Sequence, residues 1–549
     1  MNQNPDGVNL FCSEAYKKAH DRYTESVNNP GAPVWDYVFI TAANEGQAVA
    51  FSEEIEWRLA DGLLPKWTKF IVLPDPEGVR AGSGGALINV LNELKGLVKH
   101  KRGCPFRSLK TLVIHAGGES RRVPQYSVCG KIFAPVFRLL PNGKPAAFFD
   151  ELMALYSGIP ALIKEGLLSV AGDVFFFMKQ EQFGFDEVDA LSFSVKAPVK
   201  SGENHGVFIE DNTGKVKYFL HKRPPAELKS SGAVDENGLV NIDTGAVLFS
   251  AEIQEVLHRL TSLKNTSKSI DPLLNLNLYD DILSAIACAE KTDISSKNQA
   301  TPQNVKDTIR QTLKGFSLSV LKIPHSPFIH YGTTRELLVL NRPGSKIFSA
   351  SGFSNRLLLQ SDAAGEYSAL CSIISGSPLI GKGCYIENSF VGANTIIGDN
   401  CIISESYLEG ENIPENTVVH TLRLSDGHFC VRTYGTDDDF KGTLEDSSSF
   451  FQTNLKDFVN QNALDAAEIW PGTDRSLWEA RLFPVCENQK NCHILNRILY
   501  EMVSFKASQN DIKTWRKAKK TSLKESFYGA DFKSTLKNRE YMLSLLLNQ

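Results

Sequence analysis

Residues 112–136 read LVIHAGGESRRVPQYSVCGKIFAPV. The segment opens with a short apolar run, which predicts a buried strand. The run ends in three small residues: Ala116, Gly117 and Gly118. Glycines let the backbone approach a ligand closely and adopt positive φ, and consecutive amides at such a turn bind anions. Because Arg122 and Lys131 follow, the segment predicts a phosphate site in which amides hold the phosphates and cations offset their charge.

On both sides of this segment, short apolar runs alternate with helical patterns. The runs that predict strands lie at 35–43, 69–75, 109–118, 166–178 and 189–198. A strand followed by a helix is predicted at 240–260, and alternating runs around Asn212–Thr213–Gly214 predict a hairpin over 205–224. Residues 262–272 and 292–305 are rich in Ser, Asn and Lys and predict loops. This alternation predicts α/β layers with a parallel sheet.

A different periodicity occupies residues 355–420. Aliphatic residues recur there at steps of six, with one step of five: Ile380, Ile386, Val391, Ile397 and Ile403. Such steps, with Gly following several of the aliphatic residues, are typical of a hexapeptide parallel β-helix, in which aliphatic side chains fill the interior and Gly or Asn turns the corners. The alternative is an ordinary antiparallel sheet. Residues 425–549 are mixed and then helical, with helices predicted at 492–505 and 533–549.

Composition excludes several classes of protein. The chain has 549 residues, 42% hydrophobic and 22% charged, so it is globular and long enough for several domains. Its net charge of −4 argues against a nucleic-acid partner bound through bulk charge. No apolar run approaches a membrane span, and we expect no secretory signal, because MNQNPDGVNLF has neither a basic nor an apolar stretch. The ten cysteines include no CxxC pair, so we expect no zinc knuckle and a cytoplasmic protein with reduced thiols.

Two common phosphate loops are absent. A kinase P-loop requires GxxxxGK[ST], whereas Gly130–Lys131 is followed by Ile132. No Rossmann GxGxxG occurs either. The nearest stretch precedes an amphipathic helix and consists of Gly82, Ser83, Gly84 and Gly85. It predicts either backbone contact with a nucleotide or a tight strand–helix turn.

The order HAGGxSxRxP…GK, followed by an apolar residue, Pro and Val, resembles the GGxGTRLxP…PK signature of sugar nucleotidyltransferases. With GSGGALINVL upstream, it more narrowly resembles the fucose-1-phosphate guanylyltransferases (GDP-fucose pyrophosphorylases), which occur alone or fused to an L-fucokinase. The resemblance continues through AGDVFFF, YFLHKRP, FIHYGTTRELL and TYGTDDDFKGTL. It implies a Rossmann-like nucleotidyltransferase α/β domain over 1–345, a left-handed parallel β-helix over 346–424 and a mixed, helical region over 425–549.

The resemblance also implies roles for individual residues. Arg122 matches the arginine that clamps the triphosphate, and Lys131 matches the lysine that closes the signature and binds phosphate. Arg121 is interpreted as a neighbour of the site. Asp173, in AGDVFF, matches the Gly-Asp that holds Mg²⁺ in sugar nucleotidyltransferases. Many of these enzymes have a second metal Asp before a Gly-Thr, whereas this sequence and the narrower fucose family have His there, at His330.

His330 is therefore either a sugar-phosphate ligand or a structural histidine. Lys222, in FLHKRP, matches a lysine that binds the sugar phosphate, although Arg223 beside it leaves open which cation reaches the site. Asn241 and Asp243 match a segment that lines the sugar pocket, and Asp243 either holds sugar hydroxyls or ends a turn.

These matches together imply that GTP and β-L-fucose 1-phosphate, with Mg²⁺, give GDP-fucose and pyrophosphate. Two alternatives remain. In the first, the chain is the guanylyltransferase part of a bifunctional enzyme, and in the second it is a non-catalytic sugar-nucleotide sensor. Its 549 residues contain no Gly-Leu-Gly-Ser-Ser-Ala loop of the GHMP kinases, so we expect no kinase activity from them.

Overall fold

The computed structural model describes residues 5–98, 104–180, 184–185, 188–262, 275–287, 301–446 and 448–547. The chain divides into two compact units. Unit 1 comprises residues 1–118 and 149–330, and unit 2 comprises residues 119–148 and 331–549. The sequence did not indicate that residues 119–148 group with the C-terminal part of the chain.

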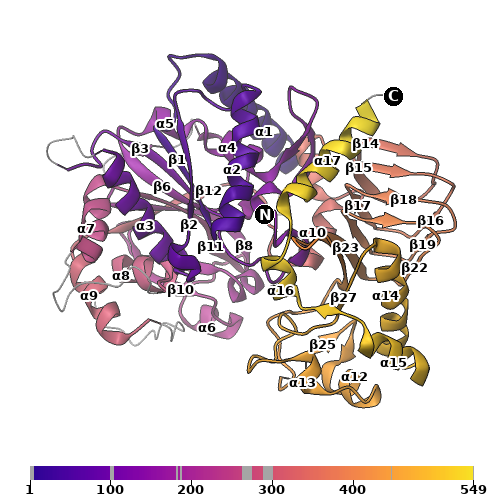
Figure 1. Cartoon of the computed structure of the whole chain (residues 1–549). Coiled ribbons are helices and arrows are strands. Elements are labelled where there is room, and N and C mark those ends of the chain that lie inside the picture. The colour runs from indigo at the N-terminus through magenta and orange to yellow at the C-terminus, as the bar shows by residue number, and fades with distance from the viewer. Residues whose placement is uncertain are drawn as a thin grey trace. The chain divides into compact units, whose positions relative to one another are not determined.

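Unit 1 is built on a nine-stranded sheet (Figure 1). Its strands are β1 (Tyr37–Ala42), β2 (Lys69–Pro74), β3 (Lys110–His115), β6 (Gly166–Ala171), β8 (Ala190–Pro198), β9 (Gly206–Glu210), β10 (Val216–His221), β11 (Leu239–Phe249) and β12 (Leu318–Ile323). The order β2-β1-β3-β6 is parallel throughout, as the alternating pattern predicted. β9 and β10 form the predicted hairpin.

Strand β11 departs from the parallel arrangement of β2-β1-β3-β6. This strand runs antiparallel to β6, β8 and β9. The reason is that chain connections set strand direction, whereas a buried apolar run has the same composition in either direction. The predicted strand at 166–178 is also interrupted at Gly172 and Asp173. It forms β6 and a short β7 (Val174–Phe175), which pairs with β13 (Ile329–His330) in a separate two-stranded sheet.

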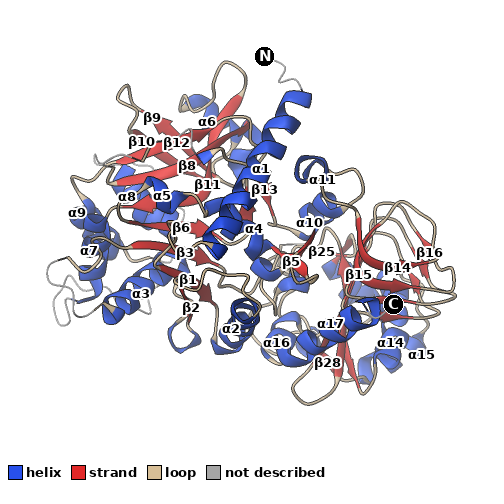
Figure 2. Ribbon diagram, turned by 90° about the horizontal axis from the view of Figure 1, so that it is seen from above, coloured by secondary structure: helices blue, strands red, loops and turns tan. Residues whose placement is uncertain are grey.

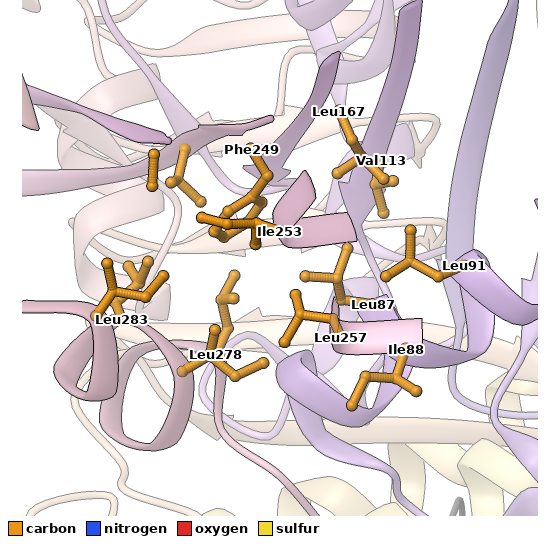
Figure 3. Close-up of a cluster of buried hydrophobic side chains, with 14 of the residues drawn as sticks. Leu87, Ile88, Leu91, Val113, Leu167, Phe249, Ile253, Leu257, Leu278 and Leu283 are labelled. Atoms are coloured by element: carbon orange, nitrogen blue, oxygen red, sulfur yellow. The ribbon is translucent and has the colours of Figure 1, made fainter. Parts of the chain in front are cut away.

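Unit 1 also contains helices, several of which contact strands of this sheet. They are α1 (Pro5–Asn28), α2 (Glu45–Ala60), α3 (Gly82–Leu97), α4 (Phe148–Tyr156), α5 (Ile159–Leu162), α6 (Pro225–Ser230), α7 (Ala251–Ser262), α8 (Ser284–Ala287) and α9 (Gln303–Leu313). The periodicity did not predict α1, because the N-terminal residues are mostly polar. Figure 3 shows the core, where Leu87 and Leu91 of α3 meet Val113, Leu167 and Phe249 of the sheet.

The strands of unit 2 are mostly short. They are β4 (Pro135–Leu139), β5 (Pro145–Ala147), β14 (Arg356–Ser361), β15 (Ser368–Ile374), β16 (Leu379–Ile380), β17 (Tyr385–Glu387), β18 (Phe390–Val391), β19 (Ile396–Ile397), β20 (Ile402–Ser404), β21 (Tyr407–Leu408), β22 (Asn412–Ile413), β23 (Thr417–Arg423), β24 (Phe429–Gly435), β25 (Ser449–Phe450), β26 (Thr453–Asn454), β27 (Phe483–Cys486) and β28 (Lys520–Thr521).

Its helices include the two predicted near the C-terminus, α14 and α17. The full set is α10 (Thr334–Asn341), α11 (Lys346–Ser351), α12 (Leu455–Gln461), α13 (Ala466–Ile469), α14 (Gln489–Val503), α15 (Gln509–Lys517), α16 (Leu523–Tyr528) and α17 (Phe532–Leu547). Helix α17 packs on β14, β15 and β23 (Figure 2).

Each strand from β15 to β20 pairs in parallel with a strand further along the chain, and the last of these partners is β23. Ile386 lies opposite Ile403, a step of 17 residues, which equals one step of five and two of six. Of the five aliphatic residues in the repeat, Ile386, Val391, Ile397 and Ile403 are buried, and Ile380 is half-buried. Asn388, Asn394 and Asn400 have φ between 46° and 57°, so Asn occupies left-handed corners between the strands, as expected.

Within the described part of the chain, no helix is both long and apolar enough to cross a membrane. The loops predicted at 262–272 and 292–305 lie mostly outside the described residues. At the end of the second stretch, helix α9 already begins at Gln303.

Candidate active site

The Ala116–Gly118 turn lies where the strand order of unit 1 reverses. Strand β1 pairs with β2 on one side and β3 on the other, and ligands of open α/β sheets bind at the carboxyl ends of strands at such a point. A Cβ on Gly117 would lie 3.0 Å from the Ala42 carbonyl carbon, so only glycine fits against the end of β1. Gly118 has φ +129° and open space around its missing side chain. The turn therefore places open backbone at this strand edge.

Part of the predicted anion cradle already has a partner within the chain. The amides of Ala116 and Gly117 each donate to Thr41 Oγ1 at 3.2 Å. Beneath the turn, His115 Nε2 lies 2.8 Å from Ser169 Oγ, and burial lowers the pKa of His115 to about 4. His115 is thus a neutral, packed histidine at physiological pH.

The second glycine stretch, Gly82–Gly85, forms the first turn of α3 rather than a loop before it. The amides of Gly84 and Gly85 donate to the Leu276 carbonyl, at 2.9 and 3.4 Å. The Ser83 hydroxyl accepts from the Leu278 amide at 3.0 Å. These contacts bind the turn to residues 275–278, which matches the structural interpretation of the glycines. Nucleotide contact by Gly82, Ser83, Gly84 and Gly85 stays a prediction.

Asp173 and His330 come together across a two-stranded pairing. In the register of β7 with β13, His330 lies opposite Val174, the residue after Asp173. His330 Nε2 is 3.7 Å from Asp173 Oδ2, and both side chains are partly exposed, at 15% and 28%. The segment around His330 therefore does reach the predicted metal carboxylate, and it brings an imidazole where many sugar nucleotidyltransferases have a second carboxylate.

Asp243 is a buried carboxyl group at an irregularity in β11. The register with β8 shifts between Asp243 and Val247, and Asp243 Oδ1 accepts from the Gly245 amide at 3.0 Å. Burial raises the pKa of Asp243 to about 7, and the Gly245 hydrogen bond opposes this rise. Tyr279 lies near both Asp243 and Asp173. Its pKa is raised first by burial and then by these two carboxylates.

The remaining predicted sugar-phosphate residues differ in exposure. Lys222 is exposed and has φ +54°, with its amide donating to the His205 carbonyl at 3.1 Å. Arg223 is buried, and its Nη1 lies 3.4 Å from Glu227 Oε1. Lys222 is therefore the more accessible of the two cations. Asn241 is half-buried on β11.

His205 was not predicted from the sequence. Its ring centroid is 5.1 Å from that of His330 and 4.6 Å from that of Phe328. His205 thus extends the group around Asp173. It precedes a hairpin strand, and neither periodicity nor a motif marks it. Tyr279 was missed for a similar reason, because it follows a stretch of chain with no pattern.

Arg122 and Lys131, the two predicted phosphate cations, lie in unit 2. The Arg122 carbonyl accepts from the amide and the hydroxyl of Thr334, at 2.9 and 3.2 Å. Its side chain is half-exposed. By contrast, Arg121 Nε bonds Glu119 at 2.7 Å and its guanidinium lies over the Trp478 ring, which supports the interpretation of Arg121 as a neighbour. Lys131 begins a single 3₁₀ turn after Gly130, whose φ is +70°.

A sequence model of the fucose pyrophosphorylase domain matches residues 105–488. The chain belongs to the fucose pyrophosphorylase family. The match includes the signature segment and all the predicted site residues apart from the glycines and serine at 82–85.

Several curated proteins resemble this fucose pyrophosphorylase family member. The fucose-1-phosphate guanylyltransferase of Mus musculus is 29% identical over 527 residues, 86% of this chain and 88% of its own length. The fucose-1-phosphate guanylyltransferase of Homo sapiens is 27% identical and 85% covered. The L-fucokinase/L-fucose-1-P guanylyltransferase of Bacteroides fragilis is 26% identical, and the chain spans 48% of its length.

The residues around Asp173 fit a magnesium ion in part. Mg²⁺ prefers oxygen ligands and often takes one or two carboxylates, with substrate phosphates and water completing its shell. Asp173 supplies one partly exposed carboxylate, whereas His330 supplies a nitrogen. In the described ranges, no group of three or more His, Cys, Asp or Glu side chains is placed to hold a metal. Asp173 is therefore the residue that would hold Mg²⁺ here, together with phosphate oxygens.

Proposed function

We propose that this protein makes GDP-L-fucose and pyrophosphate from GTP and L-fucose 1-phosphate. The observation that carries the proposal is similarity to proteins named fucose-1-phosphate guanylyltransferase over 86% of the chain. The structure supports it with an open glycine turn at the reversal of strand order and a carboxylate at Asp173.

The chemistry needs positioning and charge neutralisation rather than a general base. An oxygen of the sugar phosphate, already anionic at pH 7, attacks the α-phosphorus of the triphosphate. A new P–O bond forms as the bond to the leaving pyrophosphate breaks. We assign Arg122 and Lys131 to the triphosphate, where their charge offsets the charge that develops in the transition state. Mg²⁺, when bound at Asp173, supplies further neutralisation of the phosphates.

We assign the sugar phosphate to four polar residues of unit 1: Lys222, Asn241, Asp243 and His330. The pKa of about 7 means that Asp243 is partly protonated near neutrality. A carboxyl group in that state both donates to and accepts from sugar hydroxyls. Sugars that lack one such hydroxyl leave a buried group unpaired and should react more slowly.

For residues 355–420 we propose a parallel β-helix with three sides per turn. The support is the 17-residue register, the buried aliphatic positions and the Asn corners. We further propose a cytoplasmic location, where the thiols of the chain would stay reduced.

The test is pyrophosphate release by the purified protein with each of four nucleoside triphosphates and several sugar 1-phosphates. We expect the highest kcat/KM with GTP and L-fucose 1-phosphate, and dependence on Mg²⁺. Clear preference for glucose or mannose 1-phosphate would contradict the sugar assignment. Absence of pyrophosphate release with every pair would favour the sensor alternative.

A further inference from the structure

The signature segment of unit 2 is held at its middle by buried polar side chains of the C-terminal strands. We propose that Glu387 of β17 and Arg432 of β24 are positioning residues, which fix the backbone between Arg122 and Lys131 for nucleotidyl transfer. The inference rests on the proposed function of that segment.

Glu387 collects three hydroxyl groups in the interior of unit 2. Its side chain is 0% exposed. Oε2 accepts from the Tyr126 hydroxyl at 2.8 Å and from the Tyr385 hydroxyl at 2.7 Å, and Oε1 accepts from Ser404 at 2.7 Å. Tyr385 and Ser404 belong to neighbouring short strands, whereas Tyr126 belongs to the signature segment. The Glu387 carboxylate therefore joins the signature segment to the short strands β17 and β20.

Arg432 makes a second anchor, at positions two residues before and one residue after Tyr126. It is also 0% exposed, and its Nη1 donates to the Pro124 carbonyl at 3.3 Å and to Ser127 Oγ at 3.1 Å. Two residues along β24, the Tyr434 hydroxyl donates to Gln125 Oε1 at 2.8 Å. Residues 124 to 127 are thus each held by a group from β17 or β24.

Burial of these polar side chains costs free energy, so the stability of the fold alone does not account for them. Within the described residues, Nε and Nη2 of Arg432 have no hydrogen-bond partner, and burial lowers the pKa of its guanidinium. A buried charge without full pairing costs free energy. Proteins with apolar residues of similar volume in its place are often equally stable or more stable. Polar anchors instead fix the position of the segment that they bind, because hydrogen bonds depend strongly on geometry. A misplacement of about 1 Å in groups that act on the transition state can reduce a rate roughly 10²-fold.

Two phenylalanine variants separate positioning from stability. Tyr126→Phe and Tyr385→Phe each remove one buried hydroxyl group from the same oxygen, Glu387 Oε2, but only Tyr126 belongs to the signature segment. We expect Tyr126→Phe to lower kcat about tenfold with KM for the sugar phosphate unchanged, because the loss falls on transition-state geometry. Tyr385→Phe should keep kcat within about twofold of wild type while losing a similar amount of Tm. Equal kcat values in the two variants would overturn the proposal.

Arg432→Met provides an independent test, since it keeps side-chain volume and removes the charge. We expect its Tm to stay level or rise while kcat falls about tenfold. A lower Tm with unchanged kcat would mean that Arg432 only supports the fold, and the proposal would fail.

A readout without substrate separates this inference from the proposed function. Hydrogen exchange of peptides covering residues 119–134 should be faster in Tyr126→Phe than in Tyr385→Phe and wild type. If it is, and wild type fails to release pyrophosphate from GTP and L-fucose 1-phosphate, the anchoring stands and the function is wrong. If wild type is active but neither exchange nor kcat distinguishes the two variants, the anchoring is wrong and the function stands.

Discussion

Arg122 is the residue whose loss we expect to affect chemistry most directly. Replacing it with Ala should lower turnover by at least about 10²-fold while the protein stays folded, because one charge-stabilising donor is removed. Arg121→Ala is the matched control. Its side chain is already occupied by Glu119 and Trp478, so turnover should fall far less. Pyrophosphate release and Tm check both variants. Wild-type turnover in Arg122→Ala would remove this arginine from the mechanism.

Asp173 allows a test of metal binding. Asp173→Asn keeps the shape and removes the charge, so Mg²⁺-dependent activity should collapse with little change in Tm. Asp235→Asn is a suitable control, because the Asp235 side chain is similarly exposed, at 29%, and pairs with Lys196 at 2.6 Å. A Mg²⁺ titration of pyrophosphate release distinguishes the two. If Asp173→Asn retained both its rate and its Mg²⁺ dependence, the metal would have to be held by other groups.

Sequence alone singled out two side chains that the structure brings together. Asp173 follows a buried strand, and the Gly-Thr motif leads directly to His330, so both were named before their 3.7 Å approach was known. His205 and Tyr279 were not. They reach the site through a hairpin and through a segment without periodicity, and such contacts depend on tertiary packing. The glycines at 82–85 show the converse, since a motif typical of ligand contact here binds residues 275–278 of the chain.

The short parallel strands make a sharp prediction at the scale of an element. Ile397 is 2% exposed and its neighbour Ile396 is 45% exposed, so the two side chains point in opposite directions. Ile397→Asp places an unpaired charge among aliphatic side chains and should lower the free energy of unfolding by several kcal/mol. Ile396→Asp should change it by less than about 0.5 kcal/mol. Chemical denaturation measures both. Equal losses would contradict an aliphatic interior in this region.

A buried carboxyl group in unit 2 should make stability depend on pH. Burial raises the pKa of Asp438 to about 8, although the amides of Gly435 and Phe451 both donate to it. A raised acid pKa stabilises the folded state at low pH, and this contribution is lost as pH rises towards 8, by at most about 1.4 kcal/mol per pH unit.

Asp438→Asn removes this titration. Between pH 6 and 8 its Tm should therefore fall less than that of wild type, which thermal melts in a pH series will show. Parallel Tm curves for the two proteins would mean that Asp438 is already ionised in this range.

Elements with a strong period were predictable, and elements set by long-range pairing were not. The steps of five and six located the buried positions around Ile397, and the alternating runs located the β9–β10 hairpin, because both patterns are local. The direction of β11 and the helix α1 were missed. Strand direction depends on partners far along the chain, and α1 has too few apolar residues to show its buried face.

At the scale of the whole molecule, we expect the protein to lack kinase activity. The 549 residues contain no kinase P-loop and no GHMP loop, so L-fucose with ATP should give no ADP. In the same preparation, L-fucose 1-phosphate with GTP should give GDP-fucose. Both reactions can be followed by chromatography of the nucleotides. Formation of ADP that depends on L-fucose would show a kinase site that the sequence does not reveal.

Division of the chain into two units leads to a prediction about truncation. Residues 119–148 belong to unit 2, and their apolar side chains, such as Ile132 and Phe137, are buried. A protein ending at His330 keeps this segment but loses the rest of unit 2. We expect it to aggregate or bind hydrophobic dyes and to release no pyrophosphate. A monomeric, active 1–330 fragment would contradict the grouping of residues 119–148 with the C-terminal part.

The anchoring of Tyr126 by Glu387 also has a consequence in time. The two residues are separated by 261 positions, and Gln125 and Tyr434 by 309. At a synthesis rate of about 5–20 residues per second, a ribosome needs roughly 13 to 50 s to travel from Tyr126 to Glu387. During that interval the signature segment has left the ribosome without the strands that hold it. The nascent protein should therefore acquire activity late and all at once, and chaperones that shield apolar segments should matter most between these two points of translation.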